Sequence, residues 1–205
     1  MVGGKAEDAG LRTDTIRAAI RAKYAEVAVS AAGKFAYPTG RAGAEALGYN
    51  PDAVRQAPPE LLESFCGVGN PFLLAEIRPG AIVLDFGCGA GFDLFIASRL
   101  AGKNGRLFGA DLTAEMVRRA TENLSAAGVT NYEVTKIESE ELPYHSGFFD
   151  VVISNGVINL SPDKQACFRE LQRVLKPGGM LQFADVVQED DLPAGTSDSP
   201  EAWSQ

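Results

Sequence analysis

The chain has 205 residues, a formal net charge of −8 and a hydrophobic content of 45%. This length and composition suit one well-cored domain with at most a small appendage. The acidic balance argues against a large nucleic-acid-binding surface, and the apolar runs fall far short of the roughly 18 residues that cross a membrane. Because the amino terminus lacks the apolar stretch of a secretory signal, we expect a cytoplasmic location.

Cysteine and histidine are scarce and dispersed. The three cysteines are Cys66, Cys88 and Cys167, the single histidine is His145, and no CxxC pair occurs. Metal sites and disulfide frameworks need such residues in clusters. We therefore expect neither a metal site nor a disulfide framework.

The first 59 residues predict a cap segment outside the sheet. Residues 1–12 have the composition of a flexible leader. Over residues 11–29 apolar side chains recur at helical spacing, which predicts an amphipathic helix with an apolar face made of Ile16, Ile20, Tyr24 and Val27. Residues 30–59 are rich in Gly, Ala and Pro and predict irregular structure with at most short helices.

From residue 60 to 188 predicted strands and helices alternate. Five short apolar runs predict strands: AIVLDFG, RLFGAD, YEVTKI, FFDVVISN and MLQFADVV. Between them lie three predicted helices: FDLFIASRLAG, closed by Gly102, residues 113–127, and SPDKQACFRELQRVLKPGG, with Ser161 as N-cap, Pro162 at its first position and Pro177-Gly178-Gly179 at its end. This alternation predicts an α/β fold with a doubly wound, mostly parallel sheet. An acidic tail over residues 189–205 follows.

The stretch VLDFGCGAGFD joins the first predicted strand to the first predicted helix. Gly87, Gly89 and Gly91 give the spacing G-x-G-x-G, which differs from the G-x-G-x-x-G of dinucleotide-binding loops. Asp111 ends the second predicted strand, where a carboxylate can accept both ribose hydroxyls of a nucleoside. Loop and acid together predict S-adenosylmethionine (SAM) as cofactor, with NAD as the alternative that the spacing disfavours. The cofactor prediction fails only if two other interpretations are both true: the glycine loop is a turn that binds no ligand, and Asp111 is only a capping residue.

Residues 60–185 resemble the class I SAM-dependent methyltransferases. The blocks that carry the likeness are VLDFGCGAGFD, GADLTAEMVRRATEN, ESEELPY, FDVVISN and RVLKPGGML. Within that family the chain most resembles arsenite methyltransferases, through GNPF, LTAEMVRRA and SNGVINLSPDKQACFRELQRVLKPGG. The resemblance implies a Rossmann-like sheet, an N-terminal cap over the SAM site, and S-adenosylhomocysteine as product.

The resemblance also implies a set of SAM-contacting residues. All fall at the carboxyl ends of predicted strands, where ligands bind in open α/β sheets. They are Asp85, Gly87, Cys88, Gly89 and Gly91 on the methionine and ribose side, Asp111 at the ribose hydroxyls, Leu112 and Met116 beside the adenine, Glu138 at the adenine amino group with Ser139 next to it, and Asn155 near the methionine moiety.

Two positions depart from the arsenite methyltransferase pattern. As(III) is a soft metalloid that favours thiolate ligands, and the resemblance places family thiols where this chain has Val68 and Gly156. Cys66 is a candidate displaced thiol, whereas Cys88 and Cys167 are expected to be buried packing residues. We therefore expect weak or absent arsenite methylation.

Methyl transfer to a small-molecule acceptor is the function that these features favour. The sulfonium of SAM is already activated, so a protein needs mainly to align the acceptor and exclude water, and no catalytic residue is identified. His145 is either solvated or a general base, and three tyrosines either line a pocket or pack: Tyr24, Tyr37 and Tyr49. The alternatives are a non-catalytic SAM-binding subunit of a heteromeric methyltransferase and a divergent arsenite methyltransferase.

The predicted sheet ends at its fifth strand, whereas the sheet of the resembled family continues into an antiparallel hairpin of two more strands. Residues 180–187 would then form an exposed apolar edge, which proteins usually cover. We expect either a fragment of a longer chain or an oligomer, with a homodimer as the simplest form and a heteromeric partner over the edge as the alternative.

Overall fold

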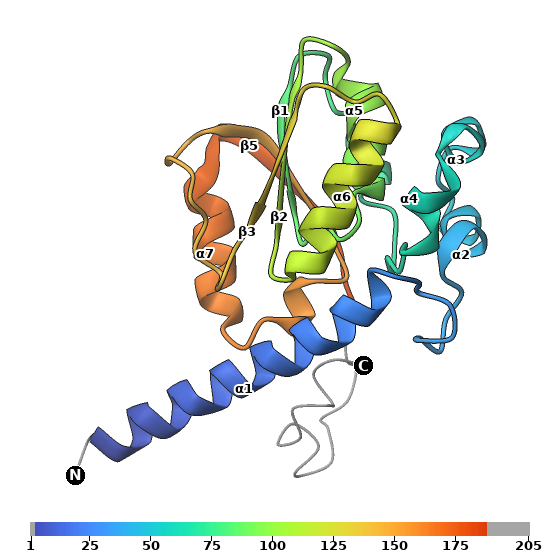
Figure 1. Cartoon of the computed structure of the whole chain (residues 1–205). Helices are drawn as coiled ribbons and strands as arrows, with labels where there is room; N and C mark the ends of the chain where they lie inside the picture. Colours follow the sequence, from blue (N-terminus) through green and yellow to red (C-terminus); the bar gives the residue numbers. More distant parts are fainter. Residues whose placement is uncertain (1–2, 188–205) are drawn as a thin grey trace.

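The computed structural model describes residues 3–187, with side chains from Thr13 onward, so the predicted acidic tail lies outside the described residues. Five strands form one sheet (Figure 1): β1 (Ile82–Phe86), β2 (Arg106–Asp111), β3 (Tyr132–Lys136), β4 (Phe149–Asn155) and β5 (Leu175–Ala184). Neighbouring strands are all parallel, in the order β3-β2-β1-β4-β5. The predicted parallel α/β sheet is confirmed.

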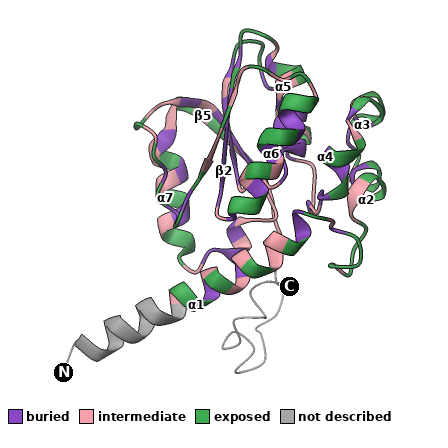
Figure 2. Ribbon diagram, viewed as in Figure 1, coloured by how far each residue is buried: buried purple, intermediate pink, exposed green. Residues whose placement is uncertain are grey.

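Helices cover both faces of the sheet. α5 (Phe92–Ala101) and α6 (Ala114–Ala126) lie on one face, and α7 (Lys164–Val174) lies on the other. One buried cluster joins α5 and α6 to Val83 and Ile153, and a second joins α7 to Leu84 and Val152. Because successive strand residues point to opposite faces, strands covered on both sides are apolar along their whole length. Figure 2 shows the buried residues concentrated in the central part of the sheet, where β1, β2 and β4 lie, and on the inner faces of the helices.

The amino-terminal segment is more helical than predicted. α1 (Gly3–Val27) covers most of the predicted leader, so the prediction of a flexible leader is wrong for residues 3–12, and the helix ends two residues before the predicted limit of 29. Once a helix has formed its first turn, each further residue is added at little cost, and no proline interrupts this stretch. The short helices expected after it are present as α2 (Gly40–Ala46), α3 (Pro51–Gln56) and α4 (Pro59–Glu63). Two short 3-10 helices are η1 (Pro71–Leu73) and η2 (Ile158–Leu160).

The start of α7 differs from the prediction. Asp163 is the N-cap in place of Ser161, because its carboxylate accepts a hydrogen bond from the Ala166 N–H at 2.8 Å. The Ser161 hydroxyl accepts the Asp163 N–H at 3.2 Å and donates to Glu140 at 2.7 Å. Ser161 thus lies two residues before the N-cap, where it supports the turn into the helix and also makes a tertiary contact.

The end of α7 also differs. The helix stops at Val174, before the Pro-Gly-Gly stretch, because Leu175 already pairs with Phe149 in the sheet. The register then shifts, so that Met180 pairs with Val151 and the Pro-Gly-Gly stretch falls in the irregular part of β5. β5 thus starts earlier than the predicted MLQFADVV and ends sooner, at Ala184.

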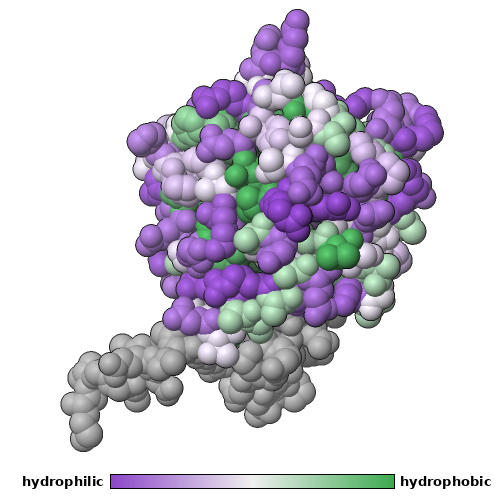
Figure 3. All heavy atoms as spheres, viewed as in Figure 1, coloured by the Kyte–Doolittle hydropathy of each residue, from purple (hydrophilic) through white to green (hydrophobic). Residues whose placement is uncertain are grey.

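The surface seen in Figure 3 is mostly hydrophilic, with hydrophobic residues in small separate groups between polar ones. No helix in the described part of the chain is long and apolar enough to span a membrane.

Candidate cofactor-binding site

The main cavity lies at the carboxyl ends of β1, β2 and β4, beneath α1. It encloses about 1080 Å³, its open mouth included. The chain leaves β1 toward α5 on one face of the sheet and leaves β4 toward α7 on the other, so this is the point where the topology switches direction. Ligands of open α/β sheets bind in the crevice at such points.

The glycine loop forms one wall of the cavity. Gly87 and Gly89 have φ angles of 75° and 50°, a region that favours glycine. A Cβ at Gly87 would overlap the Val157 side chain, whereas one at Gly89 would meet no atom within 4 Å. Gly91 does not line the cavity: it precedes α5 and packs against Ala120 and Leu124 of α6. The first two glycines therefore shape the ligand wall, and the third lets two helices approach.

Asp111 ties this loop to the end of β2. One carboxylate oxygen accepts the Gly89 N–H at 2.9 Å, and the other accepts the Thr113 N–H at 2.8 Å. Burial raises the pKa of Asp111, and these backbone hydrogen bonds oppose the rise. Each oxygen retains a lone pair, so the fixed carboxylate can still accept hydroxyl donors from a ligand.

Asp85, at the carboxyl end of β1, has a buried carboxylate oxygen without a hydrogen-bond partner in the described part of the chain. This oxygen is Oδ2, and the residue is buried and lines the cavity. Burial, followed by the nearby charges of Asp93 and Asp111, raises its pKa well above the ordinary value. A buried, unpaired carboxylate is costly, and native structures usually satisfy such a group. Asp85 is therefore the strongest local indication of a cationic ligand.

A buried polar network lies beside Asp85. The Tyr49 hydroxyl donates to Asp93 at 2.7 Å and accepts from the Asn155 amide at 3.0 Å. The Asn155 amide also donates to Asp93 at 3.1 Å, while its oxygen accepts the N–H groups of Val68 and Gly69 at 2.9 and 3.1 Å. Burial raises the pKa of Asp93 to about 6, against the opposing effect of these hydrogen bonds. The network fixes the loop around Val68 to the ends of β4 and α5.

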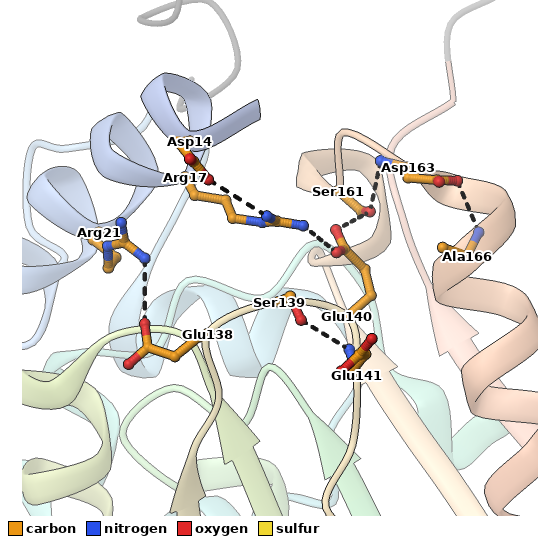
Figure 4. A network of polar contacts seen from close by, with 10 residues as sticks. All are labelled: Asp14, Arg17, Arg21, Glu138, Ser139, Glu140, Glu141, Ser161, Asp163 and Ala166. Atoms are coloured by element: carbon orange, nitrogen blue, oxygen red, sulfur yellow. Dashed lines mark hydrogen bonds and ion pairs between the residues drawn. The ribbon is translucent and has the colours of Figure 1, made fainter. Parts of the chain in front are cut away.

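α1 closes the other side of the cavity. Arg17, Ile20 and Tyr24 line it from one face of the helix. The Arg17 guanidinium donates to Glu140 at 2.5 Å, and the second oxygen of Glu140 accepts the Ser161 hydroxyl. Figure 4 shows how these three side chains join α1 to the loop after β3 and to the segment before α7. Arg17 is the one basic side chain among the described lining residues, and it is already paired.

Most of the predicted SAM-contacting residues come together here. Those that line the cavity are Asp85, Gly87, Cys88, Gly89, Asp111, Leu112, Met116, Ser139 and Asn155. Gly91 and Glu138 do not. The Glu138 side chain is 71% exposed and pairs with Arg21 at 3.6 Å and with Lys136 at 2.5 Å, which lowers its pKa. Its neighbour Glu140 is the acid that faces the cavity, a role that the sequence reasoning missed, as it did for Arg17 and Asp93.

The three thiols and His145 are dispersed. Cys66 and Cys88 line the cavity, and burial raises the pKa of Cys66 to about 12. Cys167 is a buried residue of α7 on the other face of the sheet, and His145 is exposed outside the cavity lining. Among the described residues no cluster of three or more His, Cys, Asp and Glu side chains is arranged to hold a metal ion.

The two positions that carry thiols in the resembled family are neighbours in space. A Cβ at Gly156 would lie 3.3 Å from the Val68 side chain. Of the tyrosines, Tyr24 lines the cavity, Tyr49 belongs to the polar network, and the Tyr37 hydroxyl donates to the Cys66 carbonyl at 3.0 Å.

Comparison with known proteins agrees with this geometry. A family described as "Methyltransferase domain" matches residues 77–205. The chain belongs to this methyltransferase domain family. The arsenite methyltransferase of Halobacterium salinarum is 40% identical over 164 residues, which cover 80% of this chain and 42% of that protein. A ubiquinone/menaquinone biosynthesis C-methyltransferase of Hydrogenovibrio crunogenus is 38% identical over 120 residues, 56% of this chain and 47% of that protein.

Solved structures give the same result for the fold. The arsenic(III) S-adenosylmethionine methyltransferase of Chlamydomonas reinhardtii matches with a TM-score of 0.65 and 38% identity, over 74% of this methyltransferase chain and 54% of that one. A SAM-dependent methyltransferase of Aquifex aeolicus matches with a TM-score of 0.52 and 30% identity, over 61% of this chain and 65% of that one. The predicted resemblance to arsenite methyltransferases and the Rossmann-like sheet are confirmed. The chain spans less than half the length of the curated relatives named above.

Proposed function

We propose that this methyltransferase chain binds SAM in the cavity and transfers its methyl group to a small-molecule acceptor. The observation that carries the proposal is the unpaired Oδ2 of Asp85, buried in a cavity that also holds Asp93 and Asp111. SAM has a sulfonium and an ammonium group against one carboxylate, so it enters with a net positive charge. A ligand of that charge offsets the cost of three buried carboxylates.

The residues present fit SAM in their chemistry. The lone pairs of Asp111 suit the ribose hydroxyls, the free oxygen of Asp85 suits the ammonium group, and the open space beside Gly89 suits close backbone approach. Leu112 and Met116, at the end of β2 and the start of α6, offer apolar contact for the adenine.

When bound, SAM supplies an electrophilic methyl group, and the chain needs to orient the acceptor and exclude water. Ile20 and Tyr24 cover the cavity with apolar surface, and the Arg17–Glu140 pair holds α1 in place. The network of Tyr49, Asp93 and Asn155 fixes the opposite wall. These residues position the reactants without entering the bond-making step.

We propose that the acceptor is something other than arsenite. As(III) binds best to several thiols together, and the structure has no sulfur at Val68 or Gly156 beside Cys66. Arsenite methylation by a divergent enzyme is the second candidate, which the relative at 40% identity favours. A non-catalytic SAM-binding subunit of a heteromeric methyltransferase is the third.

Calorimetry tests the binding proposal with SAM and with 5′-methylthioadenosine, which lacks the ammonium and carboxylate groups. We expect SAM to bind more tightly, and Asp85→Asn to reduce that preference. Glu122→Gln, an exposed acid on α6, is the matched control and should change neither affinity. Equal binding of both ligands by the wild-type chain would contradict the role of Asp85.

Product analysis tests the acceptor. Incubation with arsenite, a thiol reductant and SAM should give little methylated arsenic. Rapid accumulation of methylated arsenicals that Cys66→Ser abolishes would contradict the proposal and support a displaced thiol. SAM binding without S-adenosylhomocysteine release across a panel of acceptors would favour the non-catalytic subunit.

A further inference from the structure

Arg17 is the cation that an anionic methyl acceptor would need. In the described part of the chain it is the one basic side chain that lines the cavity, against four acids: Asp85, Asp93, Asp111 and Glu140. An anion leaves water at a high cost unless a cation or several hydrogen bonds receive it. Which acceptors can enter therefore depends on whether the Arg17 guanidinium is free.

The Arg17 guanidinium lies between two acids. Its Nη2 donates to Glu140 at 2.5 Å, and its Nη1 lies 3.9 Å from an oxygen of Asp14 on the same helix (Figure 4). The Arg17 and Glu140 side chains are 17% and 11% exposed, whereas that of Asp14 is 83% exposed. The contact with Asp14 is therefore weak and screened by water, and Glu140 is the acid that neutralises Arg17 at the cavity.

Glu140 is itself held in this position. Its other carboxylate oxygen accepts the Ser161 hydroxyl at 2.7 Å, so the segment before α7 fixes the side chain. The Ser161 hydroxyl in turn accepts the Asp163 N–H at 3.2 Å. An anion that took the place of Glu140 on Arg17 would leave a largely buried carboxylate without its cation, which is a costly exchange.

Apolar and aromatic side chains form much of the cavity wall that is not assigned to SAM. Five of them come from α1, from the segment after α4 and from the segment after β4: Ile20, Tyr24, Phe65, Val157 and Leu160. An apolar ligand that packs against such a wall removes apolar surface from water, which favours binding. These walls suit an acceptor with an apolar body.

We propose that the methyl acceptor is an uncharged molecule with an apolar body, and that Glu140 excludes anionic acceptors by pairing with Arg17. This inference rests on the proposed function, since it concerns the acceptor of the same cavity. Arg17 holds α1 over the cavity, and its charge alone would attract anions. Glu140 keeps the contact and removes that attraction, so it determines specificity without touching the reacting atoms.

Two probes of similar shape test the proposal: 2-naphthol, which is uncharged at neutral pH, and 2-naphthoate, which is an anion. Their fluorescence is followed while the full chain, saturated with S-adenosylhomocysteine, is titrated into each. The wild-type chain should bind 2-naphthol roughly tenfold or more tightly than 2-naphthoate. Glu140→Gln should raise the affinity for 2-naphthoate roughly tenfold, the gain expected of one charge-assisted hydrogen bond to Arg17, and should leave 2-naphthol binding unchanged.

Glu140→Gln removes the charge and keeps the shape. The Gln oxygen can accept from Arg17 while its nitrogen donates to the Ser161 hydroxyl oxygen, so α1 stays in contact with the loop after β3. Glu138→Gln is the matched control, because it makes the same change two residues away, at a side chain that is 71% exposed and outside the cavity lining. It should bind both probes as the wild type does, and thermal melting checks that each variant is folded.

Equal binding of the two probes by the wild-type chain overturns the proposal, and so does failure to bind either probe. A Glu140→Gln variant that leaves 2-naphthoate binding unchanged, or that weakens both probes alike, overturns the role of Glu140 in specificity. The titrations are repeated without S-adenosylhomocysteine, where Arg17 is also paired and the preference for 2-naphthol should persist. A chain that does not bind S-adenosylhomocysteine would thus contradict the proposed function, while the second titration still decides the acceptor preference.

Discussion

Replacing Asp111 by Asn is the sharpest test of the ribose-binding role. The two side chains have nearly the same shape, but Asn has one acceptor oxygen and no charge. In the wild-type chain both oxygens already accept a backbone N–H, from Gly89 and Thr113. The variant can keep one of these bonds, and it cannot offer charged acceptors to two ribose hydroxyls.

The magnitude follows from those bonds. A hydrogen bond to a charged acceptor contributes about 1–2 kcal/mol more than one to a neutral acceptor. Two such bonds give a loss of about 2–4 kcal/mol, or roughly 30- to 700-fold in the dissociation constant of SAM. The fold should be affected less, because burial already raises the pKa of Asp111 and a neutral side chain avoids that desolvation cost.

Calorimetry with SAM and a thermal melt of the free chain separate the two effects. We expect a large loss of affinity in Asp111→Asn and a smaller fall in melting temperature, since one buried N–H loses its acceptor while the desolvation cost of the charge is removed. Glu122→Gln makes the same chemical change at an exposed site on α6 and should alter neither quantity. Wild-type affinity in a folded Asp111→Asn variant would refute the reasoning.

Three further predictions follow from the cavity walls. Arg17→Ala removes the Arg17–Glu140 pair that holds α1 over the cavity, and it should speed dissociation of S-adenosylhomocysteine in stopped flow by about tenfold. Arg21→Ala, one turn along α1, breaks an exposed pair and should not change this rate. Equal effects of the two variants would refute a specific role of Arg17 in closing the cavity. The pKa of Asp93 rises on folding from 3.8 to about 6, so the folded state binds more protons than the unfolded state between these values. The free energy of unfolding should therefore fall as pH rises from about 4 to about 6. Denaturant titrations at several pH values should show a shallower dependence of this free energy on pH in Asp93→Asn. The double variant Val68→Cys with Gly156→Cys should gain As(III) binding, measured by thiol protection, while each single variant gains less. Gly156 has a φ of 71°, so each variant is also melted, and no gain in a double variant that folds like the wild type would contradict a common arsenic site.

Local features of the fold were predictable from the sequence because the decisive residues are neighbours in the chain. β2 matches the predicted RLFGAD because its apolar run begins after a glycine and ends at a turn. The glycine loop was predictable for the same reason. The start of α7 was not, since Ser161 and Asp163 are both good N-cap residues, and it is Asp163 that accepts the Ala166 N–H of the first turn.

Contacts between distant segments account for what the sequence reasoning missed in the site. Arg17 and Glu140 are separated by 123 positions, so nothing local indicated their pairing. Asp93 follows the glycine loop directly and could have been considered from its place in VLDFGCGAGFD, but its pairing with Tyr49 depends on the cap segment. The sequence predicts which strand ends gather at the cavity, and the fold of the cap decides which acids face it.

The end of β5 has a consequence for the cavity wall. Ala184 holds the Gly156 N–H through its carbonyl, and a side chain on Gly69 would overlap the Ala184 methyl group, so the wall that includes Gly156 rests on the end of β5. A displacement of Ala184 is therefore transmitted directly to the cavity, although Ala184 itself does not line it.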